Sequence, residues 1–283
     1  MNKPIQMPKM NVIQGVNEDP RNENTQVPWK PDAFDPPKDN VEFGDPFNWY
    51  STGQVILDFQ MPMAYVDRLN HIYELTQKIQ AGIHLPFIID GKPTKVFKLP
   101  NISKELSGKL RQEFSIYLDN EKKTTRRDNH NFLPDDIHEW IKDRIHQYIQ
   151  FTKTPYVGIR TSSAWINEYD AGEYNPLHRH TVGWRKPGVR TCWGVVGMVA
   201  LKMPSHMGEE AGMSQAEAKR NGYIDFVGVS GKQFSADMLT FKYEVGQFLV
   251  FPYDILHTVY PHFNKEEVRR TMPVNIDVYL KGS

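Results

Sequence analysis

The stretch AWINEYDAGEYNPLHRH, residues 164–180, joins a strand-like run to a turn that ends in two histidines one residue apart. Successive side chains of a β-strand point to opposite faces, so His178 and His180 share a face and can converge on one metal ion. A second strand-like run, GQFLVFP at residues 246–252, precedes His257 and can return it to the same place. Three neutral nitrogen ligands without a cysteine cluster indicate a mononuclear metal site.

An arginine follows the third histidine at the start of a further strand-like segment. Arg269, Arg270 and Thr271 are consecutive, so residues 269 and 271 share one face of that strand while Arg270 faces the other way. A guanidinium holds a carboxylate through two parallel hydrogen bonds, and a hydroxyl on the same face adds another. The pattern therefore predicts a site for the distal carboxylate of a dicarboxylic co-substrate.

The residue types leave the metal open. Neutral imidazole suits zinc, copper, iron and nickel, and two histidines with one carboxylate are typical of non-haem iron oxygenases. Three imidazoles are also the ligand set of a catalytic zinc ion. An iron enzyme and a zinc hydrolase or lyase both remain compatible with the histidines, and Arg269 favours the first because it provides for a co-substrate.

Composition narrows the class of protein. The chain has 283 residues and a formal net charge of zero, which argues against a nucleic-acid binder that works through a basic face. Its single cysteine, Cys192, excludes a framework of intrachain disulfides and favours a reducing compartment. The sequence shows neither a signal-peptide pattern nor an apolar run near the roughly 20 residues that span a bilayer. We expect a soluble, cytoplasmic protein with no membrane contact.

Residues 1–48 are rich in proline, asparagine and aspartate and poor in aliphatic side chains. Such a segment cannot bury enough apolar surface to fold alone, so we expect an extended proline-rich arm. It is either a disordered tail or an arm that wraps the domain or a neighbouring subunit, as in an arm-mediated homodimer. Its large hydrophobic residues are Val27, Trp29, Phe34, Phe43 and Phe47. Residues 49–283 are expected to form a single catalytic domain.

Three helical patterns predict a helical part over about residues 60–152. Apolar residues recur at helical spacing in residues 62–79, 103–118 and 134–149. Residues 86–89 and 95–99 read as short strands around the turn at Asp90 and Gly91. His138 and His146 fall on the third predicted helix and are expected to be solvated or capping, and His262 is expected to point away from His257.

Strand patterns dominate after residue 155. The candidate strands are residues 157–160, 163–169, 191–202, 223–229, 236–243, 247–251 and 269–280. Apart from one helical turn expected at residues 214–220, no helical crossovers separate them, which favours antiparallel pairing. The predicted fold is α+β, with a jelly-roll core over about residues 155–281 and the N-terminal helices packed on it.

Three segments together resemble the iron(II)/2-oxoglutarate-dependent dioxygenases, within a group of oxygenases distantly related to prolyl hydroxylases. Residues 164–180 resemble that group's Trp-x-Asn, Gly and His-x-His elements. Residues 246–261 resemble the segment around the distal histidine, and residues 269–275 resemble the arginine, Ser/Thr and Asn element. The three segments fall between about residues 160 and 280, less than half of the chain.

The resemblance implies a double-stranded β-helix whose mouth holds iron. It implies that His178 and His257 ligate iron(II) and that Arg269, helped by Thr271, binds 2-oxoglutarate. The chain departs from most of the wider superfamily at His180, where Asp or Glu is usual. A third imidazole leaves the ion its full +2 charge, and the alternatives at that position are water, Asp170 or Glu173.

On this interpretation the chain is a dioxygenase that consumes 2-oxoglutarate and O2, releases succinate and CO2, and hydroxylates an unidentified small-molecule or peptidyl substrate. The substrate is expected to enter over residues 203–235, which include Met203, Met207, Met213 and Tyr223. The alternatives are a zinc hydrolase or lyase with three histidine ligands and a non-catalytic jelly-roll binding or structural protein.

Overall fold

A computed structural model shows the fold of the chain. It describes residues 35, 37–38, 46–81, 87–89, 92–94, 99–119, 130–180, 193–205, 207–208, 220–228 and 238–280.

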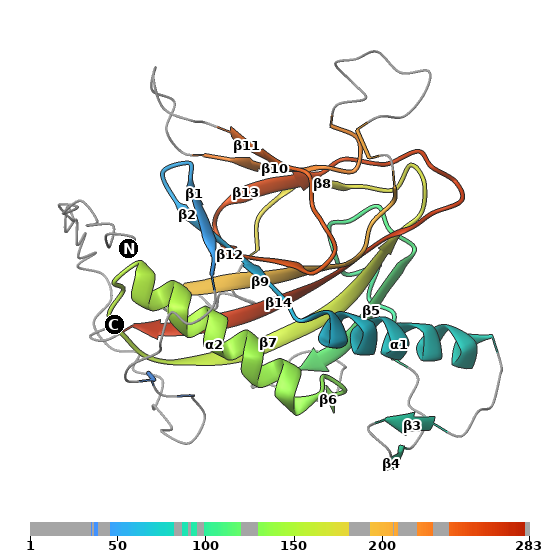
Figure 1. The fold of residues 1–283 in the computed structure, drawn as a ribbon, viewed down its shortest axis with the longest axis horizontal. Helices are drawn as coiled ribbons and strands as arrows, with labels where there is room; N and C mark the ends of the chain where they lie inside the picture. Colours follow the sequence, from blue (N-terminus) through green and yellow to red (C-terminus); the bar gives the residue numbers. More distant parts are fainter. Residues whose placement is uncertain are drawn as a thin grey trace, which may run out of the picture.

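Two antiparallel sheets face each other in the described part of the chain (Figure 1). The larger sheet has eight strands in the order β1(Asn48–Ser51), β2(Val55–Gln60), β12(Gln247–Pro252), β9(Trp193–Lys202), β14(Arg269–Leu280), β7(Tyr156–Tyr169), β5(Gln112–Leu118) and β6(His130–Asn131). The smaller sheet has four strands in the order β11(Met238–Phe241), β10(Ile224–Val227), β13(Leu256–Val259) and β8(Asn175–His178). A separate hairpin pairs β3(Phe87–Ile89) with β4(Lys92–Thr94).

Two helices, α1(Met63–Gln80) and α2(Asp135–Phe151), cover the face of the larger sheet that points away from the smaller one (Figure 1). Each follows a proline, Pro62 or Pro134, whose missing N–H costs nothing at a helix start. Helix α2 buries isoleucines at positions 137, 141, 145 and 149, one stripe at helical spacing. None of the described helices is long and apolar enough to cross a membrane.

The alternation of side chains along the central strands produces two cores. On β14, Met272, Val274 and Ile276 point to the helices and join the core between them and the larger sheet. On β9, Val196 and Met198 point to the opposite side and join the core between the two sheets. Residues of the larger sheet that face the smaller one therefore determine what the interior can bind.

The expected helices at residues 62–79 and 134–149 are confirmed by α1 and α2. The predicted strands at residues 157–160 and 163–169 form one continuous strand, β7. Strands β9, β10, β11, β12 and β14 lie within or close to their predicted ranges. The short strands β1, β2, β8 and β13 were not expected, and the helical turn expected at residues 214–220 falls almost entirely outside the described residues.

The expected helix over residues 103–118 is wrong. Turns occupy the first part, and strand β5 follows and pairs with β7. Leu110 and Phe114 are four residues apart, but Leu110 belongs to the core between the sheets whereas Phe114 belongs to the core under the helices. Their helical spacing is therefore coincidental, because the two side chains pack on opposite sides of the sheet.

The histidines of α2 are packed rather than solvated, which corrects a second expectation. His146 is fully buried, and its Nδ1 lies 2.6 Å from the Tyr156 hydroxyl. Burial lowers the pKa of His146 to about 4. His138 Nε2 lies 2.7 Å from Thr161 Oγ1, so this side chain joins α2 to β7.

Parts of the proline-rich segment lie against the domain. The backbones of Asp35 and Ile159 form an isolated antiparallel bridge, and Lys38 pairs with Asp143 of α2. The Phe47 ring lies 5.7 Å from that of Phe151. The other four hydrophobic residues of the segment fall outside the described residues, so the division at residue 48 stays a prediction.

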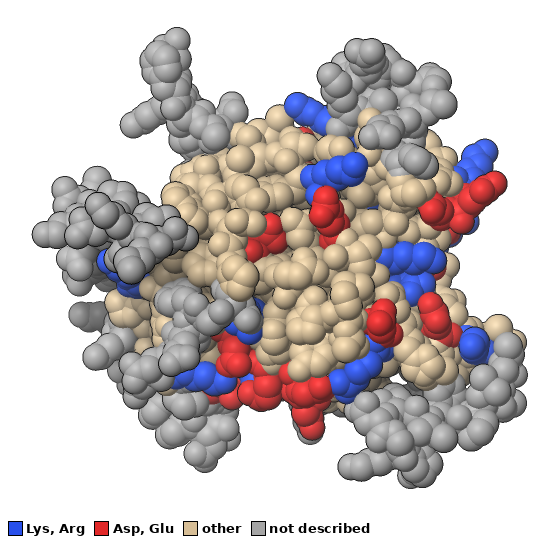
Figure 2. Space-filling view, in the orientation of Figure 1, with Lys and Arg blue, Asp and Glu red and all other residues tan. Residues whose placement is uncertain are grey.

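Acidic and basic side chains are interspersed on the face shown in Figure 2. No single-signed field covers the described part of that face, in agreement with the formal net charge of zero.

A buried ion pair fastens α1 to the sheet and generates a stability prediction. Arg270 Nη2 lies 2.6 Å from Glu168 Oε2, and Arg270 Nη1 donates to Asn70 of α1 over 2.7 Å. Arg270→Met leaves the Glu168 charge buried without its cation, so we expect a loss of about 3–5 kcal/mol in the free energy of unfolding, measured in urea.

The control is Arg68→Met, which removes the largely exposed pair of Arg68 with Asp136. That loss should stay within about 1 kcal/mol because solvent screens exposed pairs. Similar losses for the two variants would contradict the importance of the buried pair.

Candidate metal site and adjoining cavity

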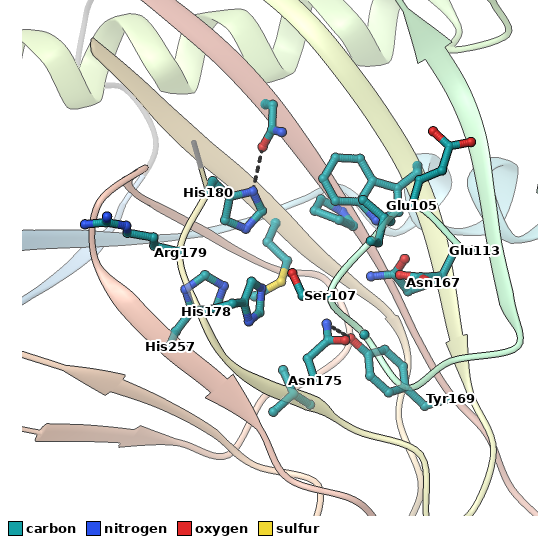
Figure 3. Close-up of a pocket in the computed structure, with 17 residues that line it drawn as sticks. Glu105, Ser107, Glu113, Asn167, Tyr169, Asn175, His178, Arg179, His180 and His257 are labelled. Atoms are coloured by element: carbon teal, nitrogen blue, oxygen red, sulfur yellow. Dashed lines mark hydrogen bonds between the residues drawn. The ribbon is translucent and has the colours of Figure 1, made fainter. Parts of the chain in front are cut away.

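Pairing of β8 with β13 brings the predicted histidines together. His178 lies directly opposite His257 in the register of the two strands, and His180 follows two residues later. The ring centroids are 4.3 Å apart for His178 and His257, 5.6 Å for His178 and His180, and 5.2 Å for His180 and His257. One nitrogen from each ring lies within 4.8 Å of the others, a set that could hold a metal ion (Figure 3).

The second nitrogen of each ring has a hydrogen-bond acceptor. His178 Nδ1 lies 2.7 Å from the Pro176 carbonyl oxygen, and His257 Nδ1 lies 3.1 Å from the Ile255 carbonyl oxygen. His180 Nδ1 lies 2.9 Å from Asn275 Oδ1. These oxygens can only accept, so each Nδ1 carries the proton and each Nε2 keeps its lone pair. The three rings are thus held in the tautomer that a metal ligand requires.

Burial keeps these imidazoles neutral. Burial, and next the neighbouring histidines, lower the pKa of His257 well below its usual value and that of His180 to about 3. The pKa of His178 is also lowered by burial. Neutral imidazole is the form that binds a divalent cation.

Glu173, one of the two carboxylates considered as alternative ligands, is occupied elsewhere. Glu173 Oε2 accepts a hydrogen bond of 3.0 Å from the Asp170 backbone N–H and so closes the turn before β8. Glu173 Oε1 lies 3.5 Å from Arg111. Within the described part of the chain, no Asp or Glu joins the cluster of three histidines.

Arg269 and Thr271 lie on the face of β14 that points between the sheets, as the sequence predicts. Both are fully buried, and residues 273 and 275 of the same face line the adjoining cavity. The Arg269 guanidinium lies 4.7 Å from the Tyr169 ring centroid and 6.0 Å from that of Tyr243. Arg270 points to the opposite side, toward α1.

The Arg269 guanidinium has no acceptor of its own. None of its three nitrogens has a hydrogen-bond partner among the described residues, and neither does Thr271 Oγ1. Burial lowers the pKa of Arg269 but leaves the group a cation, because an arginine does not lose its proton in proteins. A buried, uncompensated cation costs several kcal/mol, so this position is suited to a bound anion.

A cavity of about 230 Å³ extends from the histidines to the wall formed by β5 and β7. Alternate residues of β7, Trp165, Asn167 and Tyr169, line it, and Glu113 of β5 lies beside them (Figure 3). Arg269 is not itself a lining residue, but it stacks on Tyr169, which is. The turn residues 105–108 and Arg179 complete the boundary.

Sequence reasoning missed two of these residues. Asn275 belongs to one of the three resembling segments, but its contact with His180, 95 residues away, depends on how the two sheets face each other. Glu113 was missed because it falls inside the wrongly expected helix, although its alternation with Phe114 and Ser115 is a strand signal.

His262 was expected to point away from His257. It is buried, and its Nε2 lies 3.1 Å from the Tyr169 carbonyl oxygen.

The expected entry loop is only partly described. Met203 packs against the core between the sheets, and Met207 is buried. Met213 and most of residues 209–219 and 229–237 fall outside the described residues. The path of the substrate over residues 203–235 therefore stays a prediction.

Comparison with known proteins gives only distant structural likenesses. No family model and no curated protein matches the chain. A prolyl-4-hydroxylase from Pseudomonas putida is 11% identical, with a TM-score of 0.42 over 84% of this chain and 95% of that one. HygX from Streptomyces hygroscopicus, with nickel and 2-oxoglutarate bound, is 11% identical, with a TM-score of 0.42 over 78% and 82% of the two chains.

A viral collagen prolyl hydroxylase from Paramecium Bursaria Chlorella virus-1, in a 2-oxoglutarate complex, is 13% identical, with a TM-score of 0.36 over 59% and 77% of the two chains.

The contact between Asn275 and His180 generates a prediction for metal affinity. Asn275→Leu removes the acceptor that orients His180, so we expect iron(II) affinity to fall about 10- to 100-fold, measured by anaerobic titration. Asn275→Asp keeps an acceptor oxygen and should retain affinity close to that of the wild type. Wild-type affinity in the leucine variant would show that the contact does not support the site.

Glu113 generates a prediction for stability against pH. Burial, and next the nearby charge of Glu173, raise the pKa of the Glu113 carboxyl from 4.5 to about 8. Between these values the unfolded chain releases a proton that the folded chain retains, so stability present at low pH is lost as the pH rises through about 8. Glu113→Gln removes this dependence.

We expect Glu113→Gln and wild type to differ little at about pH 5, and the variant to be more stable by on the order of a few kcal/mol at about pH 9. Urea unfolding at both pH values measures the difference. Asp58→Asn is the matched control, because burial raises the Asp58 pKa only to about 6. The gain in the free energy of unfolding of this variant over the wild type should therefore already be complete near neutral pH. A gain for Glu113→Gln that is the same at both pH values would contradict a titrating Glu113.

Proposed function

We propose that this chain is an iron(II)- and 2-oxoglutarate-dependent dioxygenase that hydroxylates its substrate and releases succinate and CO2. The observation that supports this function most directly is the pairing of two features in one interior. One is a cluster of three neutral imidazoles, and the other is the buried guanidinium of Arg269, which has no acceptor in the described part of the chain. A metal enzyme with an anionic co-substrate needs both.

The strand order supports a double-stranded β-helix as the core. From β7 to β14 the chain places β7, β9, β12 and β14 in the larger sheet and β8, β10, β11 and β13 in the smaller one. The chain thus crosses repeatedly between two facing sheets, and none of the described residues between β7 and β14 is helical. Such winding puts the ends of β8 and β13 beside the inner face of β7, where the cavity lies.

In this proposal His178, His180 and His257 hold the metal through their Nε2 atoms. Their Nδ1–H groups donate to Pro176, Asn275 and Ile255, which fixes the rings before a metal binds. Bound iron supplies the activation of O2 that protein side chains cannot provide. His180 occupies the position where most members of the superfamily that the sequence resembles have Asp or Glu. The three protein ligands therefore contribute no negative charge.

Arg269 and Thr271 hold the distal carboxylate of 2-oxoglutarate in this proposal. The guanidinium offers paired N–H donors and Thr271 Oγ1 adds a hydroxyl, and all lack partners among the described residues. The rings of Tyr169 and Tyr243 lie against the guanidinium and exclude water from it. A carboxylate at this position converts an unfavourable buried charge into a hydrogen-bonded ion pair.

The second candidate is a zinc hydrolase or lyase, favoured by the absence of a carboxylate from the histidine cluster in the described residues. It gives no role to Arg269 and Thr271. A non-catalytic binding protein likewise leaves these groups without an anion. Anaerobic loading with iron(II) or zinc, followed by an assay for 2-oxoglutarate-dependent succinate, separates the candidates, because only the dioxygenase requires iron, 2-oxoglutarate and O2 together.

The arginine generates the prediction for this function. Arg269→Leu should raise the concentration of 2-oxoglutarate that half-saturates succinate formation by about 30-fold to several-thousand-fold, the cost of losing one partner of a desolvated ion pair. Thr271→Val removes one neutral hydrogen bond and should raise it by roughly 2- to 10-fold. Iron content should be unchanged in both variants.

A binding measurement provides the control. With metal present, 2-oxoglutarate should raise the melting temperature of the wild type but not of Arg269→Leu, because a ligand stabilises the state that binds it. Arg270→Met lowers stability but should keep the response to 2-oxoglutarate, because its side chain faces α1. An unchanged response in Arg269→Leu would contradict the co-substrate site.

A further inference from the structure

The wall of the cavity opposite the histidines is polar and buried. Glu113 of β5 lies in register with Asn167 of β7, and Trp165 follows on the same face of β7. Figure 3 shows Glu113 and Asn167 across the cavity from His178, His180 and His257. The proposed metal and co-substrate sites leave this wall without an assigned role.

Three polar atoms of this wall are buried without a partner among the described residues. They are Glu113 Oε2, Asn167 Oδ1 and Trp165 Nε1. Leaving such an atom unpaired costs about 1–3 kcal/mol, more for a charged group. Several in one wall of a cavity indicate that a bound molecule supplies the missing partners.

2-Oxoglutarate cannot supply the donors that Glu113 Oε2 and Asn167 Oδ1 lack. Both carboxylates of 2-oxoglutarate are acceptors, and the donors suited to one of them are on Arg269 and Thr271. Asn167 Oδ1 only accepts, so a carboxylate would leave it without a partner, and a carboxylate would be repelled by Glu113 whenever that carboxyl is ionised. A second molecule, one that brings hydrogen-bond donors, fits this wall.

The charged groups near Glu113 indicate what kind of donor this wall would bind. No Lys or Arg of the described residues forms an ion pair with Glu113, whose residue is only 1% exposed. The nearest charged influence on it is a second acid, Glu173, whose own partner Arg111 is 83% exposed. Because burial and this second acid raise the pKa of Glu113 to about 8, its carboxyl stays protonated near neutral pH unless a cation binds beside it. A bound ammonium group stabilises the carboxylate and a neutral hydroxyl does not, so this end of the cavity favours a cation.

We propose that Glu113 is the specificity-determining residue for the primary substrate, and that it binds a protonated primary amine with help from Asn167. An ammonium group has three donors and no acceptor, which suits two converging acceptor oxygens. The proposal depends on the proposed function only for the statement that the amine belongs to the molecule that is hydroxylated. The amine comes either from a free small molecule or from a lysine side chain of a peptide.

Calorimetry on the full chain, loaded with zinc and 2-oxoglutarate, tests the proposal without turnover. The probes are two matched pairs, n-butylamine against 1-butanol and Nα-acetyl-lysine amide against Nα-acetyl-norleucine amide. We expect wild type to bind each amine about 10- to 100-fold more tightly than its neutral counterpart, the difference that a charge-assisted hydrogen bond makes. Tighter binding of butylamine identifies a small molecule as the source, and tighter binding of the lysine amide identifies a peptide.

Glu113→Gln keeps the shape of the side chain but removes its charge, and it should abolish the preference for amines. Asp58→Asn is the matched control, because Asp58 is also a buried acid with a raised pKa but does not line the cavity. That control should keep the preference. Melting temperatures of both variants verify that they are folded.

Two outcomes overturn the inference: wild type that binds amines no better than their neutral counterparts, or a preference that survives in Glu113→Gln. These outcomes are separate from failure of the proposed function. If iron-loaded protein forms no succinate from 2-oxoglutarate while the preference depends on Glu113, the amine site stands and the dioxygenase assignment fails. If succinate forms but no preference exists, only the amine site fails.

Discussion

Strand β14 lies between β7 and β9 near the middle of the larger sheet, and its two faces separate stability from chemistry. Its outer face carries Met272, Val274 and Ile276 into the core beneath the helices. Its inner face carries the residues that adjoin the cavity, from Arg269 to Asn275. Strict alternation along one strand therefore places the proposed co-substrate site, and Asn275, which holds His180, on the same side.

Two adjacent arginines show how this alternation works. Arg270 is buried and bonded to Glu168 and Asn70, whereas Arg269 is buried and has no hydrogen-bond acceptor among the described residues. In our proposal this difference has a reason, because Arg269 binds the anionic co-substrate.

Hydrogen-bond donors and acceptors occupy separate parts of the site. Guanidinium and hydroxyl donors lie at one place, imidazole lone pairs at another, and acceptor oxygens of Glu113 and Asn167 along the far wall. Each suits a different partner: a dicarboxylate, a divalent cation and, in our inference, an ammonium group. An interior with three such regions can order a metal, a co-substrate and a substrate without placing like charges together.

Local periodicity in the sequence predicted much of this arrangement. The strand period of two predicted the phase of Arg269 against Arg270, and it predicted that His178 and His180 meet, although β8 ends at His178 and His180 lies two residues beyond it. Periodicity failed at residues 103–118, where Leu110 and Phe114 imitate a helix but pack in different cores. The strand neighbours of Glu113 and the register of His178 against His257 depend on tertiary pairing, which one sequence does not reveal.

The most direct test of the proposed chemistry is the fate of molecular oxygen. Iron-loaded protein given 2-oxoglutarate under ¹⁸O2 should form succinate that contains one labelled oxygen atom, and zinc-loaded protein should form none. At a low concentration of 2-oxoglutarate, Arg269→Leu should form no labelled succinate. That loss would show that the metal-dependent reaction requires the buried guanidinium as well as iron. Unlabelled succinate, or none with iron under any condition, would contradict the dioxygenase assignment.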